Sequence, residues 1–175
     1  MDIFLSVGSP HTAQQARFIA AIDGVLKQYG MQPRTLGRTD YHQDAPLVGI
    51  SALMDRCIGT LVVALKRKQI VSGLDRPGSN SETQLAGAHL PTPWIHIETA
   101  LAYEKAHPIL IFQESGVHLE GVLDPANGLN THIAKAEVDE LHSEGFLALF
   151  QHWYIAVRQQ SLERSISGNR VELLR

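Results

Sequence analysis

The sequence predicts a single α/β domain in which helices cover a central parallel β-sheet. Short apolar segments typical of strands alternate with longer segments whose apolar residues recur every three or four positions, as in amphipathic helices. The most apolar segment, residues 58–65, is a continuous run typical of a parallel strand that is covered on both faces. A chain of 175 residues can bury one core of its own, so we expect residues 1–175 to form one domain.

In the first half of the chain, the apolar pattern predicts strands and helices in alternation. The expected elements are a strand over residues 2–7, a helix over 11–29, a weaker strand over 31–36 and a helix over 46–57. Gly30 is suited to end the first helix, because glycine adopts the left-handed conformation common after helix C-termini. Pro33 weakens the second strand, since it cannot donate a backbone hydrogen bond.

The second half continues the alternation around a long polar segment. The expected elements are a strand over residues 58–65, a helix from 93 to about 106, a strand over 108–112 and a long amphipathic helix from about 138 to 165, interrupted, if at all, at Gly145. Thr92 and Pro93 are typical of a helix cap and of the first helical position. Residues 66–92 have the composition of a loop, and a loop of this length in a compact domain is often functional.

The predicted fold places the expected binding site at the carboxyl ends of the strands, where parallel sheets bind ligands. Glu98 lies near this edge, in the second turn of the helix that follows Thr92, on one helix face with Trp94 and Leu101. Burial of a carboxylate between apolar neighbours raises its pKa and suits acid–base or ion-stabilising chemistry. The alternative is a surface glutamate that pairs with a nearby basic residue.

Further candidates for binding a substrate lie in the loops at the same edge. They are Ser6, Gly8, Ser9, Arg38, His42, Arg67 and Trp94. The small residues after the first strand allow close backbone approach, the basic side chains could meet phosphates, and the indole could stack on a base. The alternatives are an ordinary turn, solvated loop residues and a tryptophan that packs in the core.

Composition argues against several classes of protein. The 15 basic and 18 acidic residues give a formal net charge of −3, whereas nucleic-acid binders are usually basic. The sequence shows neither a signal peptide nor an apolar run long enough to span a membrane, so we expect a cytoplasmic protein that contacts no membrane. Cys57 is the only cysteine, and the histidines lack the spacing of metal ligands, so we expect no disulfide and no metal site.

Several segments resemble two related families. Residues 94–98 (WIHIE) resemble the W-C-x-x-E motif of TIR domains, and residues 4–6 (FLS) resemble the F-x-S strand that opens them. Residues 98–102 (ETALA) and 107–110 (HPIL) resemble the E-x-G-x-A and K-P-hydrophobic segments of nucleoside 2-deoxyribosyltransferases. Residues 54–63 resemble the helix-to-strand stretch that precedes the active-site loop in both families.

The resemblance implies a flavodoxin-like three-layer sandwich and N-glycosidic chemistry. Glu98 would be the catalytic carboxylate for cleavage of NAD, by hydrolysis or by cyclisation to an ADP-ribose signal, in bacterial antiphage defence. NAD would be the substrate, no cofactor would be needed, and a homo-oligomer or a defence-system protein would be the partner.

Departures from both patterns leave alternatives open. Ile95 and Ala100 replace a cysteine and a glycine, and residues 83–97 contain no aspartate, which deoxyribosyltransferases usually carry shortly before their glutamate. The alternatives are a nucleoside 2-deoxyribosyltransferase or nucleotide N-glycosidase, and a non-catalytic nucleotide-binding or TIR-like assembly module.

Overall fold

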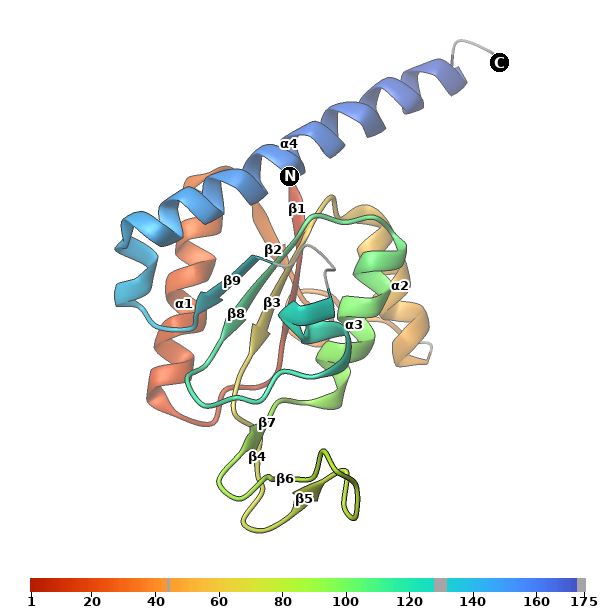
Figure 1. Cartoon of the computed structure of the whole chain (residues 1–175). Coiled ribbons are helices and arrows are strands. Elements are labelled where there is room, and N and C mark those ends of the chain that lie inside the picture. The colour runs from red at the N-terminus through yellow and green to blue at the C-terminus, as the bar shows by residue number, and fades with distance from the viewer. Residues whose placement is uncertain (44, 128–131, 173–175) are drawn as a thin grey trace.

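A computed structural model of the chain describes residues 1–43, 45–127 and 132–172, the stretch 167–172 by its helical backbone alone. Within these residues a parallel five-stranded sheet has the strand order β2-β1-β3-β8-β9 (Figure 1). Its strands are β1 (Asp2–Val7), β2 (Gln32–Arg34), β3 (Thr60–Ala64), β8 (Ile109–Gln113) and β9 (His132–Lys135). Numbered along the chain, this is the order 2-1-3-4-5 of flavodoxin-like folds.

Helices cover both faces of the sheet. Helices α1 (Ala13–Gln28) and α4 (Glu144–Glu172) pack on one face, and α2 (Pro46–Arg56) and α3 (Pro93–Glu104) pack on the other. Neighbouring side chains of each strand enter opposite cores, as Leu61 packs with α1 and α4 while Val62 packs with α2 and α3. The predicted α/β fold with a central parallel sheet is therefore confirmed.

The C-terminal helix differs from its prediction at both ends. Residues Asp139–His142 form a 3-10 turn, and α4 begins only at Glu144, not at about residue 138. Ser143 causes this late start, because its backbone is extended and its Oγ accepts a hydrogen bond from the Phe146 N–H at 3.0 Å. Gly145 lies in the first turn of α4 and does not interrupt it, and the helix continues to Glu172.

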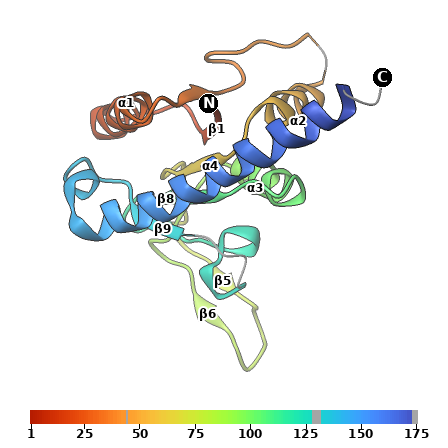
Figure 2. The same ribbon diagram turned by 90° about the horizontal axis from the view of Figure 1, so that it is seen from above.

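Helix α4 crosses the whole domain. It starts beside β8 and β9 and runs towards α2 (Figure 2), where Arg164 donates to the carbonyl oxygens of Asp55 and Cys57 at 3.1 and 2.7 Å. Phe150 and Trp153 of this helix are buried in the core of this chain. No helix in the part of the chain that the structure describes is long and apolar enough to cross a membrane.

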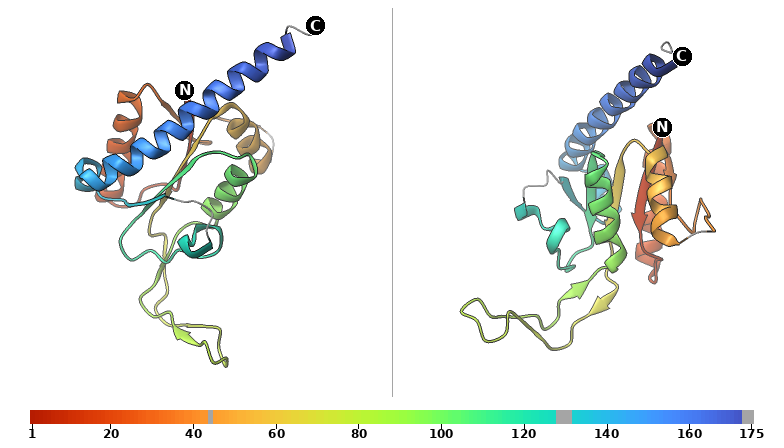
Figure 3. Two further views of the ribbon diagram at one scale, coloured as in Figure 1. Left: turned by 45° about the horizontal axis from the view of Figure 1, so that its top comes forward. Right: turned by 90° about the vertical axis from the view of Figure 1, so that its right-hand side faces the viewer.

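The segment predicted as a polar loop is folded into an arm that projects from the domain (Figure 3). The hairpin arm consists of paired short strands, β4 (Lys68–Gln69) with β7 (His89–Leu90) and β5 (Leu74–Asp75) with β6 (Thr83–Gln84). At its base the Arg67 N–H donates to the Leu90 carbonyl oxygen at 2.9 Å. The arm therefore begins directly after β3, at the edge of the sheet where ligands are expected.

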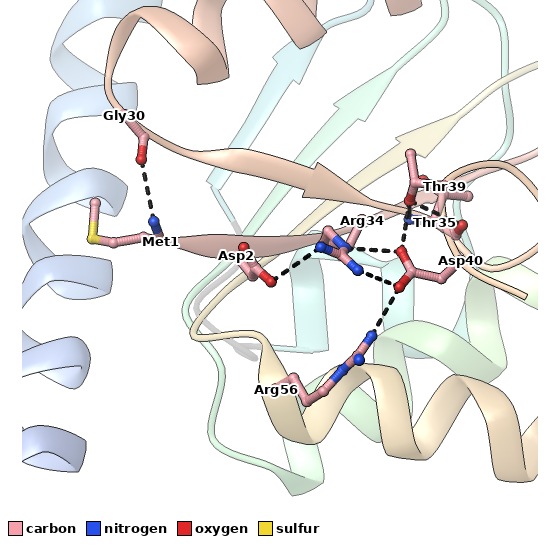
Figure 4. Close-up of polar contacts among 8 residues, drawn as sticks. All are labelled: Met1, Asp2, Gly30, Arg34, Thr35, Thr39, Asp40 and Arg56. Carbon is pink, nitrogen blue, oxygen red and sulfur yellow. Dashed lines mark hydrogen bonds and ion pairs between the residues drawn. The ribbon is translucent and has the colours of Figure 1, made fainter.

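The loop after β2 is fixed by a charged network (Figure 4). Asp40 accepts hydrogen bonds from Arg34, Arg56 and Thr39, and those to Arg34 Nε, Arg56 and Thr39 are each 2.8 Å long. The Arg34 guanidinium also lies 3.5 Å from the Asp2 carboxylate on β1. The hydrogen bond from Arg34, together with those from Thr39 and Arg56, lowers the pKa of Asp40 to about 2. The network ties this loop to β1 and α2.

Candidate active site

Helix α3 brings Glu98 to the carboxyl end of β1. The helix begins where expected, with Pro93 in its first turn and Thr92 Oγ1 accepting from the Trp94 N–H at 3.4 Å. From the second turn the Glu98 side chain reaches back to β1, where the hydroxyl of the fully buried Ser6 donates to its Oε2 atom. Leu101, three residues further along the helix, packs against the core between the sheet and helices α2 and α3.

Burial controls the ionisation of Glu98. Removal from water disfavours the charged carboxylate and raises the pKa of Glu98 to about 7, while the hydrogen bond from Ser6 acts in the opposite direction. An ordinary glutamate is fully ionised at neutral pH, whereas the raised pKa keeps the protonated form of Glu98 accessible there. Such a group can supply either a negative charge or a proton at physiological pH.

Glu98 lines a cavity of about 320 Å³ at this edge of the sheet. Of the residues predicted to bind a substrate, Gly8, Ser9, Arg67 and Trp94 also line the cavity. Ser6 lies behind them and contacts Glu98 directly. The indole of Trp94 is 44% exposed, so it forms part of the cavity wall and is not core packing.

Arg38 and His42 lie outside this cavity. Arg38 forms an ion pair with Asp23 and lines an adjoining cavity of about 620 Å³ between α1 and the loop after β2. His42 lines a smaller hollow of about 230 Å³ together with Asp40 and other residues. The structure therefore brings one group of the predicted residues together around Glu98 and places these two elsewhere.

The cavity beside Glu98 and the one beside Arg38 share a wall. Gly8 and Ser9 line both, as do Val7 and Leu36. A ligand too large for one cavity can therefore extend past the turn between β1 and α1 into the other.

His11 and Lys66, which were not among the predicted site residues, also line the Glu98 cavity. Lys66 and Arg67 give this part of the cavity wall two positive charges, and His11 adds an imidazole that can hydrogen-bond a ligand. Their positions in the chain carry the signal, because His11 follows the first strand and Lys66 the third, as expected of ligand-binding loops in a parallel sheet.

A carboxylate clamp holds Lys66 in place. The Oε2 atom of Glu114, just after β8, accepts hydrogen bonds from the Lys66 backbone N–H and from Gln15 Nε2, both at 2.8 Å. Gln15 Nε2 also contacts the Lys66 carbonyl oxygen at 3.3 Å. The clamp joins α1, β3 and β8 and fixes the backbone that carries Lys66 and Arg67 into the cavity wall.

No protein-family model and no curated protein matches the sequence, but solved structures share its fold. Among solved structures, the chain is similar to the CMP N-glycosidase BcmB of Clostridium botulinum, with a TM-score of 0.50 and 14% identity over 80% of this chain and 93% of that one. The TIR domains of the activated Roq1 resistosome, which directly recognises the pathogen effector XopQ, align with a TM-score of 0.40 and 11% identity over 91% of this chain and 82% of that one. At 14% identity, the likeness to BcmB shows that the two proteins share an α/β fold.

Proposed function

We propose that this protein cleaves the N-glycosidic bond of a nucleotide, with Glu98 as the catalytic carboxylate. The observation that carries the proposal is a mostly buried carboxyl with a pKa of about 7 in the wall of a cavity at the ligand-binding edge of the sheet. Cleavage of the bond between ribose C1 and a base nitrogen builds positive charge on the sugar. A fixed carboxylate stabilises this charge, or traps the sugar covalently, as in glycosidases.

The other residues of the cavity have roles that suit a nucleotide. Lys66 and Arg67 supply positive charge for phosphate groups, and His11 offers a further hydrogen-bonding group. Trp94 offers an exposed aromatic face on which a base can stack. Ser6 orients the Glu98 carboxylate through its hydrogen bond. We assign the substrate-binding role to these residues together with Gly8 and Ser9.

We propose NAD as the substrate. NAD joins two nucleotides through a pyrophosphate, and the cavities beside Glu98 and Arg38 share the wall at Gly8 and Ser9. The nicotinamide nucleotide would lie beside Glu98 and the adenosine beside Arg38. Nicotinamide is already cationic and leaves without a proton, so one ionised carboxylate suffices. By the motif resemblance, the product is ADP-ribose or a cyclic form of it and the setting is antiphage defence.

A mononucleotide is the second candidate substrate. BcmB, which shares the fold, is a CMP N-glycosidase, and the cavity beside Glu98 suits one nucleotide. Neutral cytosine leaves best when it is protonated, so this reaction would use the protonated form of Glu98. The rate would then fall as the pH rises through about 7, whereas NAD cleavage by the ionised carboxylate would become faster.

The test is to incubate the purified chain overnight with NAD and, separately, with CMP. Chromatography detects released nicotinamide or cytosine, and the Glu98→Gln variant is assayed in parallel. Nicotinamide release that is lost in the variant would establish the first candidate, and its co-product separates hydrolysis from cyclisation. Cytosine release would establish the second. A nucleotide that raises the melting temperature but is recovered intact would instead indicate a binding module.

The carboxylate clamp provides a second prediction for the same assay. Glu114→Ala removes a charged hydrogen bond to the Lys66 N–H, an interaction of about 1.5–3 kcal/mol, and should raise KM for the nucleotide by roughly 10-fold. We expect kcat to change little, because Glu98 is untouched. Glu120→Ala, an exposed change nearby, is the matched control and should leave both constants unchanged. A fall in kcat with constant KM would show that Glu114 does not act by positioning Lys66 and Arg67 in the cavity wall.

A further inference from the structure

Apolar side chains lie on opposite faces of α4. On one face Trp153 and Val157 are buried in the core. On the other, Ile155, Leu162 and Ile166 are 56%, 60% and 64% exposed. At 3.6 residues per turn these three side chains lie within about 40° of one another and about 180° from the buried face. This part of the helix extends towards and past the edge of the domain body (Figure 3), so the exposed stripe faces away from its own domain.

The spacing along the exposed stripe is that of a coiled coil. Ile155 and Leu162 are seven residues apart, and Ile166 follows after four more. These intervals place Ile155 and Leu162 at heptad position d and Ile166 at position a, with the exposed Gln159 at the a position between them. A polar residue at a lowers stability but favours one register. The stripe therefore has the spacing of a surface that packs against another helix, and its apolar residues are not scattered singly over the helix.

Charges beside the stripe indicate which helix that is. Arg158 and Glu163 are both exposed and occupy the flanking positions g and e. In a parallel pair, a g residue lies opposite the e residue that follows five positions later on the other helix. Arg158 of one copy would thus face the partner's Glu163, and symmetry repeats the pair. In an antiparallel pair, position g lies opposite g and position e opposite e, so Arg158 and Glu163 would not meet.

We infer that the exposed stripe of α4 pairs in parallel with the same stripe of a second copy of this chain. The two-fold axis would run along the helices, with each domain body on the outer side of the pair, because the stripe is opposite the buried face. The apolar contact extends only from Ile155 to Ile166, about 17 Å along the helix axis. One short helix pair of this length buries less surface than the roughly 800 Å² per partner of a standard interface. The dimer is therefore weak and forms at high protein concentration.

Sedimentation velocity from about 5 to about 500 µM should show the wild-type chain shifting from monomer to dimer. Leu162→Asp places a charge in the middle of the stripe and should leave the protein monomeric throughout. Leu147→Asp makes the same change at an exposed position of α4 outside the stripe, and should dimerise like the wild type. A wild-type chain that stays monomeric, or equal dimerisation of both variants, would overturn the inference.

Cross-linking and charge exchange test the register. Ile155→Cys should form a covalent dimer on oxidation, because parallel helices bring the two copies of residue 155 together, and Cys57 is buried and should not compete. Arg158→Glu and Glu163→Arg should each weaken the dimer, and the double exchange should restore it. Failure of the double variant to recover, or cross-linking that survives addition of Leu162→Asp, would contradict the parallel pair.

Discussion

Glutamine in place of Glu98 should abolish release of the base while making the folded protein more stable at pH 8. The side chains are nearly isosteric, so the cavity keeps its shape, but the amide cannot carry the negative charge that the developing sugar cation requires. Removal of one preorganised electrostatic group typically lowers kcat by about 10²- to 10³-fold. We expect at least this loss, read as nicotinamide or cytosine formed per hour.

The gain in stability follows from the raised pKa. The folded-state pKa of Glu98 is about 7, whereas its ordinary value is 4.5. Ionisation therefore costs folding free energy above pH 7, and this cost disappears as the pH falls towards 4.5. A shift of this size corresponds to at most roughly 3 kcal/mol. Urea unfolding of both proteins should show the variant more stable by up to that amount at pH 8, and by less than about 1 kcal/mol at pH 5.

The control for this pair of measurements is Glu120→Gln, which neutralises an exposed carboxylate and should change neither quantity. Two results would contradict the role of Glu98. One is a variant that retains wild-type turnover. The other is a stability difference that is the same at pH 5 and pH 8, which would mean that the Glu98 carboxyl has an ordinary pKa in the folded state.

Much of the site was predictable because it depends on local patterns. The Thr92–Pro93 cap fixes the start of α3, and with that start the helical period places Glu98 and Trp94 on one face. The continuous apolar run at residues 58–65 identified β3. Because parallel sheets bind ligands at the carboxyl ends of their strands, the loop after β3 was then expected beside Glu98. Arg67 was found in this way, and Lys66 could have been found by the same rule.

Side-chain directions in irregular segments were not predictable. Arg38 turns to Asp23 of α1, because the Asp40 network folds the preceding loop back against β1 and α2. That network joins residues far apart in the sequence and leaves no periodic signal. Strand β9 was missed because only two of its four residues are apolar, and it is a strand only through pairing with β8. The hairpin arm was read as a loop for the same reason, since each of its strands has only two residues and most of these are polar.

Trp153→Ala should cost the largest share of the folding free energy. The indole is 1% exposed, its ring lies 5.5 Å from that of Phe150, and its Nε1 donates to the Pro108 carbonyl oxygen at 3.0 Å. Truncation of a buried tryptophan leaves a cavity and costs about 3–5 kcal/mol. A domain of ordinary stability has only about 5–15 kcal/mol in total, so urea unfolding should move to a far lower midpoint.

Trp153→Phe separates packing from the hydrogen bond. The Pro108 oxygen also accepts from the Thr60 N–H at 3.0 Å, so loss of the indole donor does not leave it unpaired, and the phenyl ring keeps part of the packing. The loss should therefore be clearly smaller than for alanine, and Tyr103→Ala, an exposed aromatic change, should lie within about 0.5 kcal/mol of the wild type. Equal losses for Trp153→Ala and Tyr103→Ala would mean that α4 is not docked as the structure has it.

Trp153 belongs to the core that also holds β1, β3 and β8, so its removal should unfold the cavity together with the helix. Activity should therefore disappear at the same urea concentration as the helical signal.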